Sequence, residues 1–328
     1  MKRRIKLSGL KPFGWQGIEL QVPVDWNFVV ESGGRDAGLM GFTSPSSKFE
    51  LKWEKPKKKG GFSIDTAAEN FVKKLQKADK KFKILNEGSM KVFNHKAIYF
   101  YYQTGHEGYG IMWYCDQEEK IFVGLFAFKP DGHEKAKIIL ENLLSSLKCH
   151  PSNNWNNWAL FDFSFKTPSD FKVEDRKFLL GFVNLVLSKI ESHPLCSEKT
   201  EVVFQYWSPA NVKFKGEYKD LKRWFEQHYA RDFKKRYKGK MRIGEFQDLR
   251  INGHKAKTFT STTKQGLVLS QILGKINAYL WYCSKSNRIY ALTLSKSVSK
   301  EVKFVSRKQY ETFPSEVFGE ILSSVKCH

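Results

Sequence analysis

Leu144-Ser145-Ser146-Leu147-Lys148-Cys149-His150 recurs as Leu322-Ser323-Ser324-Val325-Lys326-Cys327-His328, and Trp113-Tyr114-Cys115 recurs as Trp281-Tyr282-Cys283. Between these matches and in the same order, Asn94-His95-Lys96-Ala97 corresponds to Gly253-His254-Lys255-Ala256. Self-similarity with a period of about 160 residues indicates two whole domains rather than the short repeats of a solenoid. We predict a first repeat over residues 1–150, a short polar linker over 151–157 and a second repeat over 158–328.

The order of predicted elements is the same in both repeats. Each opens with strands of period two, passes through a basic amphipathic helix, continues with strands joined by short polar turns and closes with a second helix. The turns at residues 93–95 and 251–254 carry Asn, and Asn-Gly is a strong hairpin signal. The fold class predicted is α+β, with two tandem copies of an antiparallel sheet flanked by helices. The helices are expected near residues 67–82, 138–147, 221–237 and 318–325.

The chain is strongly basic in both halves. Its formal charge is +22; residues 1–150 carry 25 Lys and Arg against 17 Asp and Glu, and residues 151–328 carry 31 against 17. A field of this sign attracts polyanions, so nucleic acid is the first partner to consider, ahead of an anionic membrane or an acidic protein. The alternative is a Lys-rich surface that serves only solubility or heat resistance.

Composition limits which classes of protein the chain can belong to. With 41% hydrophobic and 15% aromatic residues, 328 positions are enough to form two ordinary cores without the help of a metal. No apolar run approaches the roughly 20 residues that a membrane helix needs, and Met1-Lys2-Arg3-Arg4 leads into Gly and Pro rather than into a signal-peptide core. We expect a soluble, cytoplasmic and monomeric protein with no membrane partner and no small-molecule substrate.

The order of elements, the Pro-x-Asp-aromatic segments at Pro23 and Pro168 and the closing Leu-Ser-Ser helices resemble the PsbP-like fold. That resemblance implies an α/β/α sandwich in each repeat and a binding or assembly role rather than catalysis. The duplication, the basic balance and the lack of catalytic motifs also resemble a class of archaeal ribosome hibernation proteins. This second resemblance implies rRNA in both ribosomal subunits as the partner and inhibition of translation as the role.

Basic residues are grouped in three segments that we predict to contact RNA phosphates. Trp155, in the Asn-rich linker, is added as a ring that would stack on a base. Phe233 and Tyr237 lie among the charges of the third segment, where they either stack on bases or, as their place on the apolar stripe favours, pack in the core. The predicted RNA-binding residues are Lys2, Arg3, Arg4, Lys57, Lys58, Lys59, Trp155, Arg223, Arg231, Lys234, Lys235, Arg236, Lys238, Lys240 and Arg242.

Four of the five cysteines fall at equivalent positions, as Cys115 with Cys149 and as Cys283 with Cys327. Each pair is either a disulfide, as in some hyperthermophile proteins, or two buried free thiols. Cys196 has no counterpart. We predict no metal site, because Cys149-His150 and Cys327-His328 lack the Cys-x-x-Cys or His-x-x-x-His spacing by which one element presents two ligands.

No catalytic constellation is apparent. His95 and His254 occupy matching hairpin positions, without a Ser, an Asp or a second His at an interpretable spacing. Lys57-Lys58-Lys59-Gly60-Gly61 lacks the residue order of a phosphate-binding P-loop. We therefore expect no enzyme, no catalytic residue and no cofactor. The predicted function is that of a two-headed RNA- or ribosome-binding protein, and the alternative is an adaptor for an acidic protein partner.

Overall fold

The computed structural model describes residues 9–56, 63–193, 196–213, 220–267, 270–300 and 313–328. The chain divides into two compact units, unit 1 over residues 1–160 and unit 2 over residues 161–328. Residues 155–157, assigned to a linker above, belong to strand β10 (Trp155–Leu160), which pairs antiparallel with β1 (Leu10–Trp15) in unit 1. Lys2, Arg3, Arg4 and Lys57 to Lys59 lie outside the described residues.

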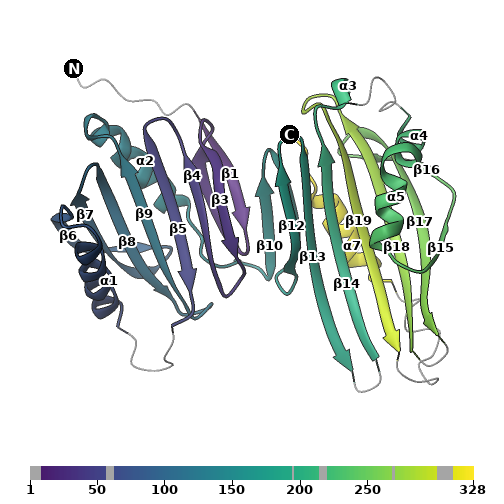
Figure 1. Ribbon diagram of the computed structural model, residues 1–328, viewed down its shortest axis with the longest axis horizontal. Coiled ribbons are helices and arrows are strands. Elements are labelled where there is room, and N and C mark those ends of the chain that lie inside the picture. The colour runs from purple at the N-terminus through teal and green to yellow at the C-terminus, as the bar shows by residue number, and fades with distance from the viewer. Residues whose placement is uncertain (1–8, 57–62, 194–195, 214–219, 268–269, 301–312) are drawn as a thin grey trace. The chain divides into compact units, whose positions relative to one another are not determined.

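Unit 1 contains a seven-stranded antiparallel sheet in the order β3-β4-β5-β9-β8-β7-β6 (Figure 1). The hairpin of β1 and β2 (Ile18–Pro23) supplies further buried side chains, among them Trp15, whose ring meets Trp158 of β10 edge-on at 5.5 Å. The strands of the large sheet are β3 (Asn27–Gly33), β4 (Ala37–Thr43), β5 (Ser47–Glu54), β6 (Lys83–Val92), β7 (His95–Gln103), β8 (Glu107–Cys115) and β9 (Lys120–Phe128).

Two helices pack on opposite faces of the unit 1 sheet. Alternation along β7 directs Phe100 and Tyr102 toward the apolar side of α1 (Ile64–Ala78), whereas Tyr99 faces α2 (His133–Ser146). The N-cap of α1 is Ser63, whose hydroxyl accepts a hydrogen bond from the Thr66 amide. A single 3-10 turn, η1 (Pro130–Gly132), precedes α2.

Unit 2 repeats the architecture with a larger sheet. Its strands follow the order β12-β13-β14-β19-β18-β17-β15, and β16 also pairs with β17. The stretch after Phe182 is longer than in unit 1 because β13 and β14 form a hairpin of two twelve-residue strands. The strands of unit 2 are β11 (Phe163–Pro168), β12 (Lys172–Leu179), β13 (Phe182–His193), β14 (Cys196–Trp207), β15 (Lys240–Ile243), β16 (Gln247–Ile251), β17 (His254–Leu267), β18 (Ser270–Cys283) and β19 (Arg288–Lys300).

The predicted basic helix of unit 2 is divided into three segments. They are α4 (Leu221–Trp224), the π-helical turn η3 (Phe225–Tyr229) and α5 (Ala230–Arg236); a shorter helix, α3 (Ala210–Lys213), precedes them. The π turn keeps Phe225, Tyr229 and Phe233 on one side, where they join a core cluster with Phe259 and Ile276 of the sheet. Figure 1 shows α5 lying across this sheet.

Helix α7 (Ser315–Ser324) packs with β11, and Phe204 of the sheet meets the rings of Phe163 and Phe165 at 4.2 and 5.1 Å. Each unit is therefore an antiparallel sheet with helices on its faces, and the predicted α+β class is confirmed. Among the described residues, no helix combines the length and the apolar character that crossing a membrane requires.

Candidate functional sites

The hairpin histidines are positioned by tight turns. In unit 1, Val92 pairs with His95, and the two residues between them, Phe93 and Asn94, have φ angles of 45° and 70°. In unit 2, Ile251 pairs with His254 around Asn252 at 48° and Gly253 at 80°. Two successive positive φ angles are the signature of a type I′ hairpin turn, so both predicted hairpins are confirmed. Each turn places a histidine at the first position of the following strand.

Beside each histidine lies a cysteine at the end of the neighbouring strand. β7 pairs with β8 through Ala97 and Trp113, and β17 pairs with β18 through Ala256 and Trp281. Two residues further along each antiparallel pair, the register brings His95 beside Cys115 and His254 beside Cys283. Both cysteines are fully buried.

The closing Cys-His pairs reach the same place from the helices. After α2, Lys148 exchanges two backbone hydrogen bonds with Glu19 of β2, at 2.9 and 2.8 Å. After α7, Lys326 makes the equivalent exchange with Ser164 of β11, at 2.9 and 2.7 Å. These isolated bridges fix the two residues that follow, Cys149-His150 and Cys327-His328, against the hairpin and the strand end.

The result is two clusters of the same composition, which we call cluster 1 and cluster 2. Cluster 1 consists of His95, Cys115, Cys149 and His150; cluster 2 consists of His254, Cys283, Cys327 and His328. Within each cluster, one nitrogen or sulfur atom from every residue lies within 4.8 Å of the others. Cysteine and histidine are the ligands that zinc and similar ions prefer, so each cluster could hold a metal.

In cluster 1, Nδ1 of His150 lies 3.3 Å from Cys115 Sγ and 3.6 Å from Cys149 Sγ. Nε2 of His95 is buried and forms no hydrogen bond with the described part of the chain. On the other side of this ring, Nδ1 of His95 lies 4.0 Å from a carboxylate oxygen of Asp116. The Phe93 ring covers His150 at a centroid distance of 4.8 Å.

In cluster 2, the same ring atoms face the sulfurs. Nδ1 of His328 lies 3.3 Å from Cys283 Sγ and 3.4 Å from Cys327 Sγ, and Nε2 of His254 lies 3.2 Å from Cys327 Sγ. His328 is exposed, whereas its counterpart His150 is buried. The position of Asp116 is taken by Ser284, which Lys285 follows directly in the sequence.

The electrostatics of the clusters favour one thiolate in cluster 1. The Cys149 thiol donates to the Cys115 sulfur, which lowers the pKa of Cys115 to about 5, and the same hydrogen bond raises the pKa of Cys149. In cluster 2, burial and then the neighbouring Cys283 raise the pKa of Cys327 to about 12. Burial, His328 and Lys285 together lower the pKa of His254, which disfavours the charged form of its ring.

Of the two alternatives for the cysteine pairs, the structure has the free thiols. The members of each pair do meet, but all five cysteines are free, and a histidine nitrogen lies against each clustered sulfur. The predicted absence of a metal site rested on spacing along the chain, which reveals only ligands that one element presents. Here three elements contribute: a hairpin, a strand end and the segment after a helix. The recurrence of all four residues in both repeats was the sequence signal for these clusters.

The predicted RNA-binding residues within the described chain lie mostly on unit 2. Trp155 is half-buried at the start of β10. Arg236 is also half-buried, with its Nη1 3.8 Å from Oε1 of Glu201. Phe233 is fully buried and Tyr237 packs against the same core, so both rings belong to the core. The exposed members of the predicted set are Arg223, Arg231, Lys234, Lys235, Lys238, Lys240 and Arg242.

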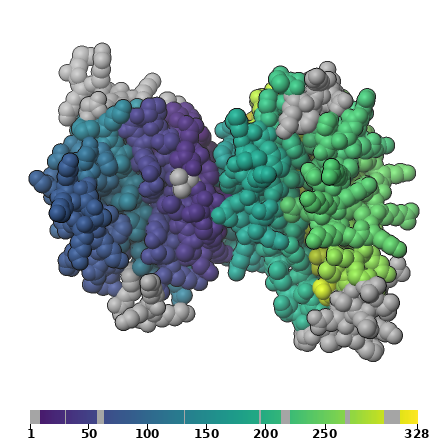
Figure 2. All heavy atoms as spheres, viewed as in Figure 1, coloured from purple at the N-terminus to yellow at the C-terminus, as the bar shows by residue number. Residues whose placement is uncertain are grey.

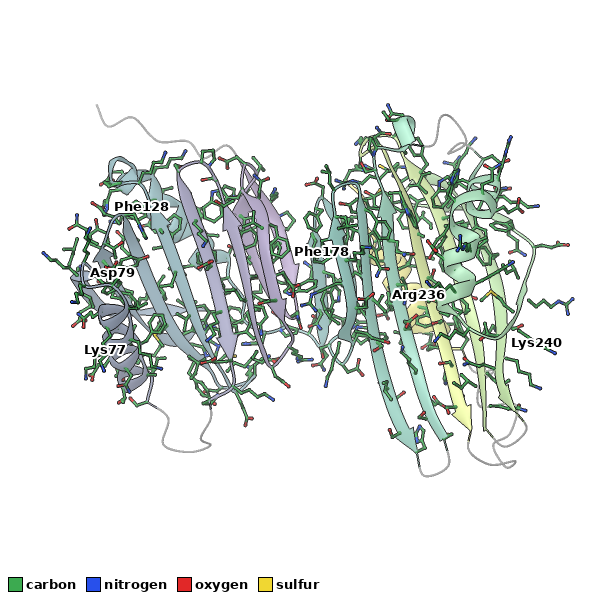
Figure 3. The ribbon with its side chains drawn as sticks, in the orientation of Figure 1. Lys77, Asp79, Phe128, Phe178, Arg236 and Lys240 are labelled. Carbon is green, nitrogen blue, oxygen red and sulfur yellow. The ribbon has the colours of Figure 1, made fainter. Side chains whose placement is uncertain are left out.

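The basic segment does not form one surface. Met241 and Ile243 of β15 pack against the core beneath α5, so the alternating side chains of Lys240 and Arg242 lie on the opposite face of the sheet. Figure 3 labels Arg236 at the end of α5 and Lys240 at the outer edge of the sheet. The cations of the helix and those of the strand therefore face different directions.

On that opposite face, strand register brings two further lysines beside Lys240 and Arg242. Lys240 pairs with Lys264, while Arg242 pairs with Thr262, which pairs with Lys275 of β18. Lys275 Nζ lies 5.4 Å from the centre of the Phe313 ring. Among the described residues, these four cations, which we call the sheet-face cations, make no ion pair. Sequence reasoning missed Lys264 and Lys275 because only the register joins them to the β15 residues.

Comparison with known proteins gives likenesses in fold only. No protein family model matches the chain, and no curated protein sequence matches it. Among solved structures, it is similar to the cyanobacterial PsbP (CyanoP) of Synechocystis sp. PCC 6803, with 12% identity over 45% of this chain and 96% of that one, at a TM-score of 0.35.

Two further structures match over the length of both repeats. One is from the Tle4-Tli4 complex, with 8% identity over 98% of this chain and 99% of that one, at a TM-score of 0.33. The other is the immunity protein TplEi of the T6SS from Pseudomonas aeruginosa, with 8% identity over 97% and 96%, at a TM-score of 0.28. Identities and scores this low carry no argument about function.

Proposed function

We propose that the chain is a non-enzymatic RNA-binding protein of the cytoplasm, that the ribosome is its target, and that unit 2 provides the principal contact. The observation that carries the proposal is the group of sheet-face cations, Lys240, Arg242, Lys264 and Lys275. Lys240 and Lys264 are directly opposite each other on adjacent strands, an arrangement that costs stability because like charges repel. A polyanion would relieve that repulsion.

Other lysines on the same face of the sheet are paired with acidic side chains. Lys296, which pairs with Lys275, forms a 2.8 Å ion pair with Glu198, and Lys189 lies 2.7 and 3.1 Å from Asp170 and Glu191. In the part of the chain that the structure describes, the four sheet-face cations at the edge formed by β15, β17 and β18 have no acidic partner. A linear array of phosphates along an RNA backbone is a ligand of matching charge.

The exposed cations of α4 and α5 provide a second basic surface on the other face of the same unit. Arg231, Lys234 and Lys235 are exposed on α5, which lies on the face of unit 2 that is turned toward the viewer in Figure 2. Two basic faces on one unit fit a large RNA-rich particle better than they fit one short RNA strand. A protein that occupied RNA surfaces of the ribosome in this way would act as a translation-inhibiting or hibernation factor.

The test is a comparison of two fourfold variants of the full chain. K240A/R242A/K264A/K275A removes the sheet-face cations, and K73A/K74A/K77A/K80A removes four exposed lysines on or next to α1 of unit 1, with the same change of net charge. Each neutralised phosphate contributes about 0.9 to the salt slope, or about fivefold in affinity at 0.15 M salt. The first variant should therefore lose up to several hundredfold in binding to purified ribosomes, and the second much less.

Equal losses in both variants would show that only net charge matters, and would remove the sheet face from the proposal. Binding in a cell extract that survives ribonuclease and high salt would instead support an adaptor for an acidic protein. Circular dichroism spectra of both variants provide the control for folding.

A further inference from the structure

We propose that each unit binds one zinc ion in a closed Cys2His2 centre. The ligands in unit 1 are Nε2 of His95, Sγ of Cys115, Sγ of Cys149 and Nδ1 of His150. The ligands in unit 2 are the same atoms of His254, Cys283, Cys327 and His328. This inference is independent of the proposed RNA binding, because no residue of either cluster belongs to the basic surfaces.

The distances from sulfur to ring nitrogen are close to those of a tetrahedral zinc site, and all four donor atoms of each cluster lie within 4.8 Å of one another. With Zn–S bonds of about 2.3 Å and Zn–N bonds of about 2.0 Å, the edges of the tetrahedron measure about 3.3 to 3.8 Å. The distances from sulfur to ring nitrogen are 3.3 and 3.6 Å in cluster 1 and 3.2, 3.3 and 3.4 Å in cluster 2. One ion at the centre of either cluster needs only small shifts of side chains.

Hydrogen bonding alone leaves these donors poorly satisfied. A ring nitrogen carries at most one proton, yet Nδ1 of His150 lies within 3.6 Å of two sulfurs, and so does Nδ1 of His328. Nε2 of His95 is buried and has no hydrogen-bond partner in the described structure. An unpartnered buried nitrogen costs free energy, which a metal ligand bond at that atom would remove.

The duplication is a second, independent argument. The surroundings of the two clusters have diverged, with Phe93 replaced by Asn252 and Asp116 by Ser284, while all four donors recur. Nδ1 of the closing histidine faces both sulfurs in each unit, and in cluster 2 Nε2 of the hairpin histidine also faces Cys327. Buried thiols kept only for packing would not require two histidines at fixed positions beside them.

The surroundings of His95 add the outer contact that metal-bound histidines usually have. A ligating imidazole commonly presents its other nitrogen to a carboxylate, which fixes the ring and raises its basicity. Nδ1 of His95 lies 4.0 Å from the exposed carboxylate of Asp116, which a small side-chain rotation would bring within hydrogen-bond distance. Four protein ligands leave no open position for water or substrate, so these centres are structural rather than catalytic.

The experiment is metal analysis of the full chain, purified without chelators and reconstituted with zinc. We expect two zinc ions per chain. C115S/C149S and C283S/C327S should each retain one, and the combined variant none. The control is C196S, which changes the half-buried cysteine outside both clusters and should retain two. A wild-type chain that takes up no zinc, or either double variant that retains two ions, would overturn the proposal.

A measurement on the wild-type chain covers the case in which a double variant fails to fold. Cobalt(II) added to the reduced apo protein should give the ligand-field bands of a tetrahedral site and a thiolate charge-transfer band, both saturating at two equivalents. Alkylation should modify Cys196 alone before chelation and the four clustered cysteines afterwards. Octahedral cobalt spectra, or alkylation that does not depend on the chelator, would contradict the proposed centres.

Discussion

Cluster 1 and cluster 2 present the same four side chains at the same points of the fold, but their surroundings differ. In unit 1, His150 is buried under Phe93, and His95 faces Asp116. In unit 2, His328 is exposed, and Lys285 acts on His254 where unit 1 has no cation. The duplicated fold thus keeps the donors and varies solvent access and charge, which are the properties that control how tightly and how long an ion is held.

The largest expected effect is that of metal removal on stability. A ligand present at a thousandfold excess over its Kd stabilises the folded state by about 4 kcal/mol. For a unit of this size, that corresponds to a fall in Tm of about 8 to 16 °C on chelation. Calorimetry of the full chain with and without a chelator measures the fall, and hydrogen exchange followed by mass spectrometry assigns it to each unit.

Unit 2 should unfold at the lower chelator concentration. An unchanged Tm in the C283S/C327S variant, measured against wild type after zinc reconstitution, would mean that cluster 2 does not contribute to folding.

A second difference between the units concerns a buried ion pair beside the cluster. Lys120 of unit 1 is almost fully buried, and its Nζ lies 2.7 Å from Glu118, which also contacts Arg35 at 2.9 Å. The corresponding cation of unit 2 is Arg288, whose partner Asp162 lies at 3.6 Å and is largely exposed. Removing Glu118 leaves a buried charge unpaired, so E118Q should cost about 2 to 4 kcal/mol, whereas D162N should cost less than about 1 kcal/mol.

The ion pair of Glu118 and Lys120 makes the folding stability of unit 1 depend on pH. Burial acts to raise the pKa of Glu118, but hydrogen bonds from Arg35 and Lys120 outweigh it and hold this pKa below its ordinary value. Because the folded pKa is lowered, the stabilisation is present above the unfolded value of about 4.3 and is lost as the pH falls through the folded pKa. Urea unfolding at pH 7 and below pH 4 should show E118Q converging with wild type in acid. A constant difference would exclude this account.

The duplication, the α+β class, both hairpins and the closing helices could be predicted from the sequence, because each depends on local periodicity or on turn residues such as Asn252-Gly253. The clusters could not be derived from spacing, because His95, Cys115 and Cys149 meet only through strand register and the bridge between Lys148 and Glu19. The sheet-face cations have the same origin, since Lys264 and Lys275 join Lys240 and Arg242 across strands.

The smallest expected effect sharpens the comparison between the clusters. Loss of an outer carboxylate typically weakens metal binding by about tenfold to a hundredfold. Because Asp116 is exposed and 4.0 Å from His95, we expect D116N to accelerate zinc release from cluster 1 by about tenfold. Release to a coloured chelator should be biphasic in the wild type, and D116N should bring the slow phase toward the fast one. A fast phase that persists in C283S/C327S would assign rapid release to cluster 1 instead.

The most direct test of the two metal centres is X-ray absorption at the zinc edge, recorded on the full chain reconstituted with zinc and on the C115S/C149S and C283S/C327S variants. We expect two sulfur and two nitrogen neighbours, at about 2.3 and 2.0 Å, around zinc in all three samples. A ligand shell dominated by oxygen, or a wild-type spectrum without sulfur neighbours, would contradict the proposed centres.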